Sequence, residues 1–184
     1  MRVIAGTARS LPLKAPKGLD TRPTTDRIKE TLFNMIQNRV PDGIFVDLFA
    51  GSGAMGIEAL SRGARHAYFI ENDREALSCI RDNLSFTKFT DRATLLRQDA
   101  VSALSMIPER EVDILFMDPP YRMECERDIF SALSRQSYVT QDTLIIVEAH
   151  LSRAFDFVGD LGFMVEREKR YKTNKHVFCR KEAL

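Results

Sequence analysis

The sequence predicts an α/β protein built on a doubly wound, mostly parallel sheet with helices on both faces, and two features lead to this prediction. After residue 43, short runs that are almost entirely apolar alternate with stretches whose apolar residues recur at helical spacing. Strands as apolar as these are buried on both faces, which is typical of a parallel sheet covered by helices. We expect about seven strands, the last inserted antiparallel, and a small extension before the sheet.

The chain before the first of these strands has a different character. Residues 1–23 are basic and are interrupted by glycines and prolines, so we expect short strands and turns there. A helix is expected over 24–38, because its apolar residues form one stripe and Thr24 or Thr25 can serve as its N-cap. The chain therefore divides into a basic N-terminal extension of a short hairpin and a helix, residues 1–40, and a main domain, residues 41–184.

The first elements of the main domain follow from apolar runs and helix signals. Residues 44–48 form a nearly continuous apolar run, and the helix expected over 54–62 stops at a glycine. A second strand is expected over 67–70. Asp73 can then cap a helix that runs to about Leu84 and carries its apolar residues on one face.

The same alternation continues toward the C-terminus. Strands are expected over 93–96, 112–117 and 143–147, with helices over 100–106 and 125–134 between them. The last two strands are expected over 163–167 and 176–179. Because so few residues separate these two, we expect them to be antiparallel neighbours.

Composition excludes several classes of protein. The 184 residues are 44% hydrophobic and 29% charged, which indicates a globular chain with a core rather than a disordered one. We find no run long enough to span a bilayer and no secretory signal. The cysteines and histidines are too scattered for a metal site: Cys79, Cys125, Cys179, His66, His150 and His176. We therefore expect a cytoplasmic protein with reduced cysteines and no bound metal.

The net charge of +1 conceals a segregation of charge along the chain. Residues 1–40 have a net charge of +5, residues 41–160 of −8 and residues 161–184 of +4. If the two basic ends meet in space, they form a positive face of the kind that binds a polyanion. The alternative is two solvated, basic ends with no partner.

A glycine-rich loop follows the first strand of the main domain. Residues 51–56 read Gly-Ser-Gly-Ala-Met-Gly, and Glu71 stands 20 residues after Gly51, at the end of the next strand. In nucleoside-binding sites of this fold the glycines permit a tight turn and the acidic residue accepts hydrogen bonds from a ribose diol. The pattern indicates an adenosine-containing cofactor, with a tight turn that binds no ligand as the alternative.

Asp47, four residues before the loop, bears on which cofactor this is. A carboxylate there disfavours a pyrophosphate and suits a ligand with cationic groups. S-adenosyl-L-methionine carries an ammonium and a sulfonium group and no phosphate. The alternative is a carboxylate that caps a helix or a turn.

The fourth apolar run ends in the motif Asp118-Pro119-Pro120-Tyr121. Two prolines restrict the backbone there and remove two N–H donors, which leaves a carboxylate, a carbonyl and an aromatic ring beside the sheet. The carboxylate and the Pro119 carbonyl can accept both N–H bonds of an exocyclic amine, and Tyr121 can stack on a base. The alternative is a turn that ends a strand, with a core tyrosine.

These motifs resemble those of class I S-adenosylmethionine-dependent methyltransferases that act on amino groups. The resemblance is closer to one family. The segments Arg2–Gly6, Thr21–Asn34 and Asp47–Gly53 are similar to the bacterial RsmD family, the 16S ribosomal RNA guanine-N2 methyltransferases. The likeness covers nearly the whole chain, and the run Thr21–Asn34 is far more specific than the glycine loop.

The resemblance implies roles for individual residues. The cofactor would be bound by Asp47, Phe49, Gly51, Gly53, Glu71, Asn72, Asp99 and Ala100. The target guanine would be held by Asp118, Pro119, Pro120 and Tyr121. The RNA substrate would contact Arg2, Arg9, Arg22, Thr24, Asp26, Arg27 and Tyr121. Asp99 can equally be a helix N-cap, and the charges near Asp26 can equally belong to a helix start, a solvated face or a salt bridge.

The resemblance thus implies methylation of the N2 amine of one guanine in 16S rRNA, within an assembling or assembled small subunit. We expect the enzyme to be a monomer. The released proton would reach solvent near Asp118, since we identify no dedicated general base. The alternatives are methylation of adenine N6 or cytosine N4, methylation of a protein glutamine amide, a nicotinamide-dependent oxidoreductase, and a non-catalytic RNA-binding module.

Overall fold

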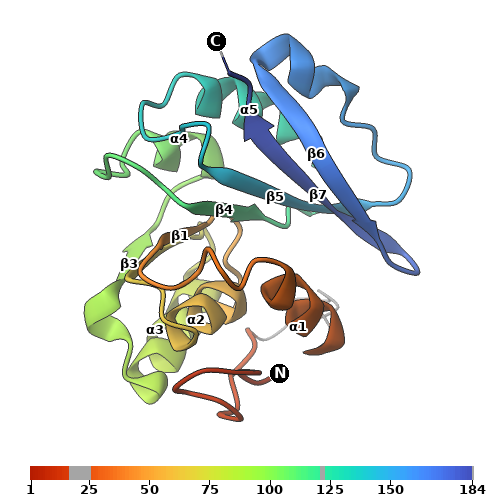
Figure 1. Ribbon diagram of the computed structural model, residues 1–184. Helices are drawn as coiled ribbons and strands as arrows, with labels where there is room; N and C mark the ends of the chain where they lie inside the picture. The colour runs from red at the N-terminus through yellow and green to blue at the C-terminus, as the bar shows by residue number, and fades with distance from the viewer. Residues whose placement is uncertain (17–25, 121–122, 184) are drawn as a thin grey trace.

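A computed structural model describes residues 1–16, 26–120 and 123–183 and shows a seven-stranded sheet in the order β3-β2-β1-β4-β5-β7-β6 (Figure 1). The strands are β1 (Ile44–Asp47), β2 (His66–Ile70), β3 (Ala93–Leu96), β4 (Ile114–Met117), β5 (Leu144–His150), β6 (Phe163–Arg170) and β7 (Asn174–Lys181). The helices are α1 (Asp26–Met35), α2 (Ala54–Ser61), α3 (Arg74–Thr87), α4 (Ala100–Leu104) and α5 (Glu126–Ser134), with 3-10 turns at Thr90–Arg92 and Asp156–Leu161.

The first five strands are parallel, and β7 lies antiparallel between β5 and β6. Both the mostly parallel sheet and the antiparallel insertion of the last strand confirm the prediction. From β1 the chain proceeds outward to β2 and β3, and it then crosses back to β4 on the other side of β1. The strand order therefore reverses between β1 and β4. In open α/β sheets, ligands bind beyond the carboxyl ends of the strands at such a point.

Each central strand is buried on both faces, as its apolar sequence predicts. Val46 and Met117 pack with α4 and α5 in one core, whereas Phe45 and Phe116 pack with α1, α2 and α3 in the other. Figure 1 shows these two helical layers above and below the sheet. Alternate residues of one strand therefore belong to different cores, which fixes the face on which each polar side chain lies.

The N-terminal residues fold back on themselves and pack against α2. Arg2 and Pro12 form an antiparallel bridge, and the Val3 N–H donates to the Leu11 carbonyl at 3.0 Å. The Glu58 carboxylate of α2 accepts hydrogen bonds from the backbone N–H groups of Ile4 at 2.7 Å and Ala5 at 3.1 Å. A buried acidic side chain on α2 thus anchors this segment to the main domain. The division of the chain at residue 40 stays a prediction.

Several element boundaries differ from those predicted. Helix α1 ends at Met35 rather than residue 38, and α4 ends at Leu104 rather than 106. Helix α3 runs three residues beyond Leu84 to Thr87, and its C-cap Lys88 adopts a left-handed conformation. The predicted caps Thr24 and Thr25 lie outside the described residues.

Several strand boundaries also differ from the predicted ones. β4 begins at Ile114 instead of residue 112, because the Val112 N–H donates to the Tyr138 carbonyl instead of joining the ladder. β5, β6 and β7 are all longer than predicted. Antiparallel pairing with β7 extends through charged residues that carry no apolar pattern. Within the described ranges, no helix is both long and apolar enough to cross a membrane.

Candidate active site

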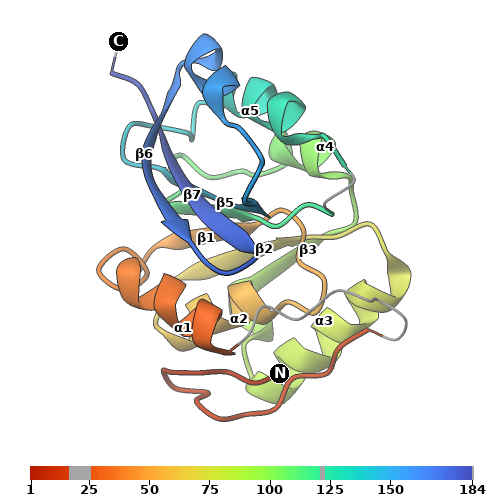
Figure 2. The same ribbon diagram turned by 90° about the vertical axis from the view of Figure 1, so that its right-hand side faces the viewer.

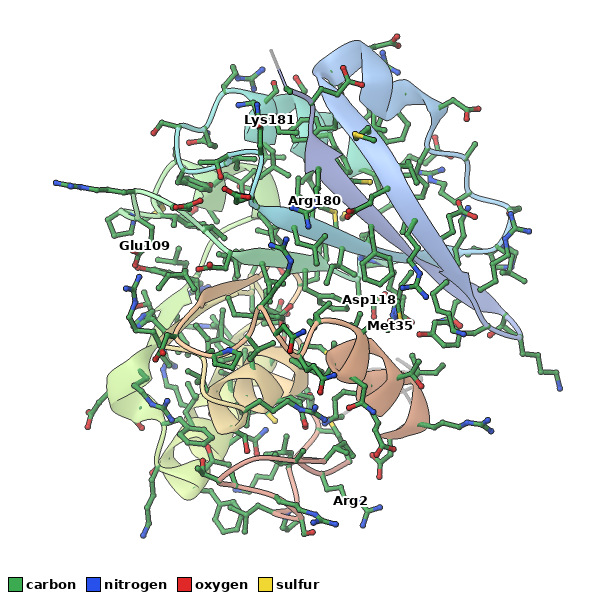
Figure 3. The ribbon with its side chains drawn as sticks, in the orientation of Figure 1. Arg2, Met35, Glu109, Asp118, Arg180 and Lys181 are labelled. Atoms are coloured by element: carbon green, nitrogen blue, oxygen red, sulfur yellow. The ribbon has the colours of Figure 1, made fainter. Side chains whose placement is uncertain are left out.

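A cavity of about 340 Å³ lies at the carboxyl ends of β1, β2 and β4. In Figure 3, β4 runs from the side of Glu109 toward Asp118, and Figure 2 looks onto the edge where the parallel strands end. The cavity brings together eight of the predicted site residues: Phe49, Gly51, Glu71, Asn72, Asp99, Ala100, Asp118 and Pro120. Three others, Asp47, Gly53 and Pro119, are buried and are not part of its lining.

The glycine loop has the geometry that its residues permit. Gly51 and Gly53 have φ angles of 54° and 79°, in the left-handed region that favours glycine. The Gly51 N–H donates to Glu71 Oε2 at 2.9 Å, while Glu71 Oε1 accepts from the N–H groups of Asn72 and Asp73 at 2.9 and 3.0 Å. Glu71 therefore joins the loop to the end of β2 and presents its carboxylate at the cavity wall.

Asp47 is buried beneath this loop, with an exposed fraction of 1%. Neither of its carboxylate oxygens has a hydrogen-bond partner among the described residues. Burial raises the pKa of Asp47 to about 7, and the charge of Glu71 adds to the rise. The N–H groups of Gly56 and Phe49 oppose it without reaching hydrogen-bonding geometry. An unpartnered buried carboxylate of this kind fits a site for a ligand with cationic groups.

Asp47 should make the ligand-free protein less stable as pH rises. Its pKa is about 7 in the folded state against 3.8 without burial. Between these two values the folded state keeps a proton that the unfolded state releases, so this contribution to stability is lost as pH rises from the lower value to the higher. Asp47→Asn has no carboxyl group to titrate and lacks this loss. The free energy of unfolding of the variant minus that of wild type should therefore be about 2 to 3 kcal/mol larger at pH 8 than at pH 5. Urea unfolding at both pH values measures this; a difference independent of pH would contradict it.

Asp99 is the N-cap of α4, as one of the two interpretations of this residue holds. Its Oδ1 accepts from the Ser102 N–H at 3.0 Å, and hydrogen bonding to Ser102 lowers the pKa of the Asp99 carboxyl. Asp99 and Ala100 both line the cavity. Capping uses one carboxylate oxygen, so the cofactor role remains compatible with the cap and stays a prediction.

Asp118 stands immediately after β4, at the junction of the cavity with the side of the sheet that α1 covers (Figure 3). Burial raises its pKa well above the usual range for a carboxyl, and the negative charges of Glu148 and Asp47 add to this. Pro119 is buried and Pro120 is exposed. The Pro120 carbonyl accepts from the Met123 N–H at 2.7 Å. Tyr121 lies outside the described residues.

The sequence motifs did not reveal part of the cavity lining or a buried polar pair beside Asp118. The lining residues that carry no motif are Leu48, Ile70, Gln98, Val101, Met123, Cys125 and Ile129. The pair is Glu148, on the strand next to Asp118, and His176, which lies 3.1 Å from Glu148. Glu148 had a detectable signal, because an acidic residue follows an apolar run there just as Asp47 and Asp118 do. His176 had none.

Of the predicted RNA-contacting residues, the four that the structure describes, Arg2, Arg9, Asp26 and Arg27, are not part of the cavity lining. Arg2 pairs with Asp26 at 2.8 Å, as the salt-bridge interpretation holds, and Figure 3 shows Arg2 well separated from Asp118. Arg9 and Arg27 are exposed. Arg22 and Thr24 lie outside the described residues. Contact of these residues with RNA therefore stays a prediction.

The two basic ends of the chain do not meet as a whole. In Figures 1 and 2, the described N-terminal residues 1–16 lie at the bottom of the molecule and the C-terminus lies at the top. Only the turn between β6 and β7 extends toward α1, at the edge where the parallel strands end. Among the described residues, no group of three His, Cys, Asp or Glu side chains could hold a metal ion.

Comparisons with known proteins agree with this geometry. The family described as conserved hypothetical protein 95 matches residues 1–180. The Bacillus subtilis protein YlbH, an rRNA methyltransferase by name, is 40% identical over 174 residues, which cover 93% of this chain and 94% of YlbH. Ribosomal RNA small subunit methyltransferase D of Escherichia coli K12 is 35% identical over 92% of this chain and 84% of its own.

Solved structures extend the agreement to the fold. The Escherichia coli protein yhhF, a methyltransferase by title, superposes with a TM-score of 0.83 at 33% identity, covering 100% of this chain and 99% of its own. A precorrin-6y C5,15-methyltransferase from Geobacter metallireducens, at 21% identity and a TM-score of 0.68, shares the fold over 93% of this chain and 94% of its own. The chain belongs to the conserved hypothetical protein 95 family, the RsmD family of methyltransferases, and has their class I fold.

Proposed function

We propose that this protein transfers a methyl group from S-adenosyl-L-methionine to the N2 exocyclic amine of a guanine in 16S rRNA of the small subunit. The observation that carries this proposal is the position of Asp118: it lines the same cavity as the glycine loop and Glu71. A group that can accept N–H bonds from an amine therefore lies beside a site suited to an adenosine cofactor. The names of the relatives YlbH and methyltransferase D support rRNA as the acceptor.

The residues of the cavity fit the proposed cofactor. Glu71 offers a carboxylate to a ribose, and the side chains of Phe49, Met123 and Ile129 give the apolar surface that an adenine ring needs. Asp47 and Asp118 bring two carboxyl groups together at the inner end of the site, and their mutual repulsion adds to the raised pKa of Asp118. A ligand with a sulfonium and an ammonium group would relieve that repulsion and favour the ionised carboxylates, whereas the pyrophosphate of a nicotinamide dinucleotide would increase it.

The chemistry of the acceptor explains what Asp118 does. The lone pair of an aromatic exocyclic amine is delocalised into the ring, so the amine is a weak nucleophile. When bound, the cofactor supplies an activated methyl group. Asp118 accepts an N–H bond of the amine, orients its lone pair and stabilises the positive charge that develops on nitrogen. Basic residues in the two end segments of the chain would contact phosphates, which position RNA without reading its sequence.

The test supplies labelled S-adenosyl-L-methionine together with several acceptors. We expect label in small subunits, or in 16S RNA, from cells that lack the family enzyme, and none in duplex DNA or in protein. Transfer to DNA or to a glutamine amide would move the proposal to another amino acceptor. Calorimetric binding of NAD without binding of S-adenosyl-L-methionine would exclude methyl transfer altogether. We further propose that the enzyme acts as a monomer in the cytoplasm.

A further inference from the structure

A row of polar side chains crosses the sheet beside Asp118. In the pairing of β4 with β5, Met117 is opposite Val147, so Asp118 lies next to Glu148 one position further along. Glu148 is in turn opposite His176 of β7. Alternation along the strands places all three on the face that packs against α1, since Phe116 and Phe178 belong to that core. Two carboxylates and an imidazole are therefore neighbours on one face of the sheet.

Glu148 is held in place by two hydrogen bonds inside the protein. Its Oε1 accepts from Asn174 Nδ2 at 2.5 Å, and its Oε2 lies 3.1 Å from His176 Nε2. The exposed fractions are 5% for Glu148, 5% for Asn174 and 0% for His176. Two hydrogen-bond partners on one buried carboxylate satisfy both of its oxygens and fix its orientation.

The hydrogen bonding continues outward from His176. Its Nδ1 lies 3.2 Å from the hydroxyl of the half-buried Tyr171. If Nε2 carries the proton and donates to Glu148, then Nδ1 accepts from the Tyr171 O–H. Both ring nitrogens of His176 then have a hydrogen-bond partner. The array of Tyr171, His176, Asn174 and Glu148 thus has one outer end near solvent and one inner end beside Asp118.

Resting on the methyl transfer proposed above, we propose that Glu148 is a positioning residue: held by Asn174 and His176, it presents a fixed negative charge to Asp118 and keeps Asp118 able to take up the proton that the methylated amine must release. In this step the N–C bond forms as the S–C bond of the cofactor breaks, leaving a neutral thioether. The N–H electron pair stays on nitrogen, and the proton passes to an Asp118 oxygen and later to water. No further reactant is needed.

The charges around Asp118 support a role for Glu148 rather than for another group. Asp47 from β1 and Glu148 from β5 both act on Asp118, and Glu148 has the larger effect after burial itself. His176 reaches Asp118 only through Glu148, and Lys169 of β6 lies one strand further out, opposite His176. Glu148 is the neighbour whose removal should change the titration of Asp118 most.

The test compares Glu148→Gln, His176→Leu and His176→Gln with wild type. In Glu148→Gln, the titration midpoint of Asp118, followed by carbon NMR of ¹³C-labelled aspartate and assigned with Asp118→Asn, should fall by about one pH unit or more. The acid limb of the kcat profile should move the same way. His176→Leu should shift both in the same direction, whereas His176→Gln should restore them because glutamine can still donate to Glu148.

His66→Leu is the matched control, because His66 bonds Thr94 at the opposite ends of the strands and should change neither measurement. An unchanged Asp118 midpoint in Glu148→Gln would overturn the inference. So would a shifted midpoint with an unchanged acid limb, or a loss of activity that is equal at every pH. The NMR measurement needs no acceptor, so absence of RNA methylation by wild type would contradict the proposed function separately.

Discussion

Replacing Asp118 with alanine is expected to lower kcat by about 10³-fold, because the amine then loses the group that accepts its N–H bond and its proton. Asp118→Asn retains a carbonyl acceptor but cannot take up a proton, so we expect an intermediate loss of roughly 10- to 100-fold. Single-turnover methyl transfer measures both. Cofactor affinity, measured by calorimetry, should change by less than about tenfold, because the glycine loop and Glu71 remain intact.

The control for this experiment is Asp91→Ala, which removes an exposed aspartate on the 3-10 turn before β3. Its activity should match wild type. An Asp118→Ala enzyme that retains more than a tenth of wild-type kcat would show that the acceptor amine is activated elsewhere. Loss of cofactor binding in the same variant would instead assign Asp118 to the cofactor.

Replacing Glu58 with alanine is expected to lower the free energy of unfolding by about 3 to 5 kcal/mol. Glu58 is fully buried and pairs with Lys29 at 3.3 Å and Arg62 at 2.8 Å, besides accepting from the N–H groups of Ile4 and Ala5. Burial lowers the pKa of Lys29 and Glu58 opposes this, so removing Glu58 leaves an unpaired buried ammonium. Urea unfolding should show the loss, and Tm should fall by roughly 6 to 20 °C.

Two further variants separate the buried charge from general loss of packing. Glu30→Ala removes an exposed glutamate from α1 and should leave Tm unchanged. Glu58→Ala combined with Lys29→Met should recover part of the stability, because the unpaired buried ammonium is removed as well. If the double variant is less stable than Glu58→Ala alone, then the N–H bonds to Ile4 and Ala5, and not the ion pair, dominate this anchor.

The fold could be predicted because its signals are local. Each parallel strand is a short apolar run, and Gly51 and Gly53 mark the turn into α2 with conformations that other residues rarely adopt. That Glu71 and Asp118 line one cavity was predictable for the same reason: both directly follow such runs, and the carboxyl ends of parallel strands meet at one edge.

The features that could not be predicted depend on contacts between distant parts of the chain. His176 becomes a neighbour of Glu148 only because β7 inserts beside β5, and nothing near His176 in sequence indicates this. Lys29 reads as a solvent-facing residue of an amphipathic helix, yet it is buried because Glu58 of α2 and the Arg2 carbonyl meet it. Charge–charge pairing across elements leaves no periodic pattern in the sequence.

The central claim, methylation of a guanine amine in 16S rRNA, is tested most directly by the chemical identity of the product. Small subunits that lack the modification would be incubated with S-adenosyl-L-methionine and either wild type or Asp118→Ala, and their 16S RNA digested to nucleosides for mass spectrometry. We predict N2-methylguanosine with wild type and none with the variant. N6-methyladenosine, N4-methylcytidine or no methylated nucleoside with the wild-type protein would contradict the claim.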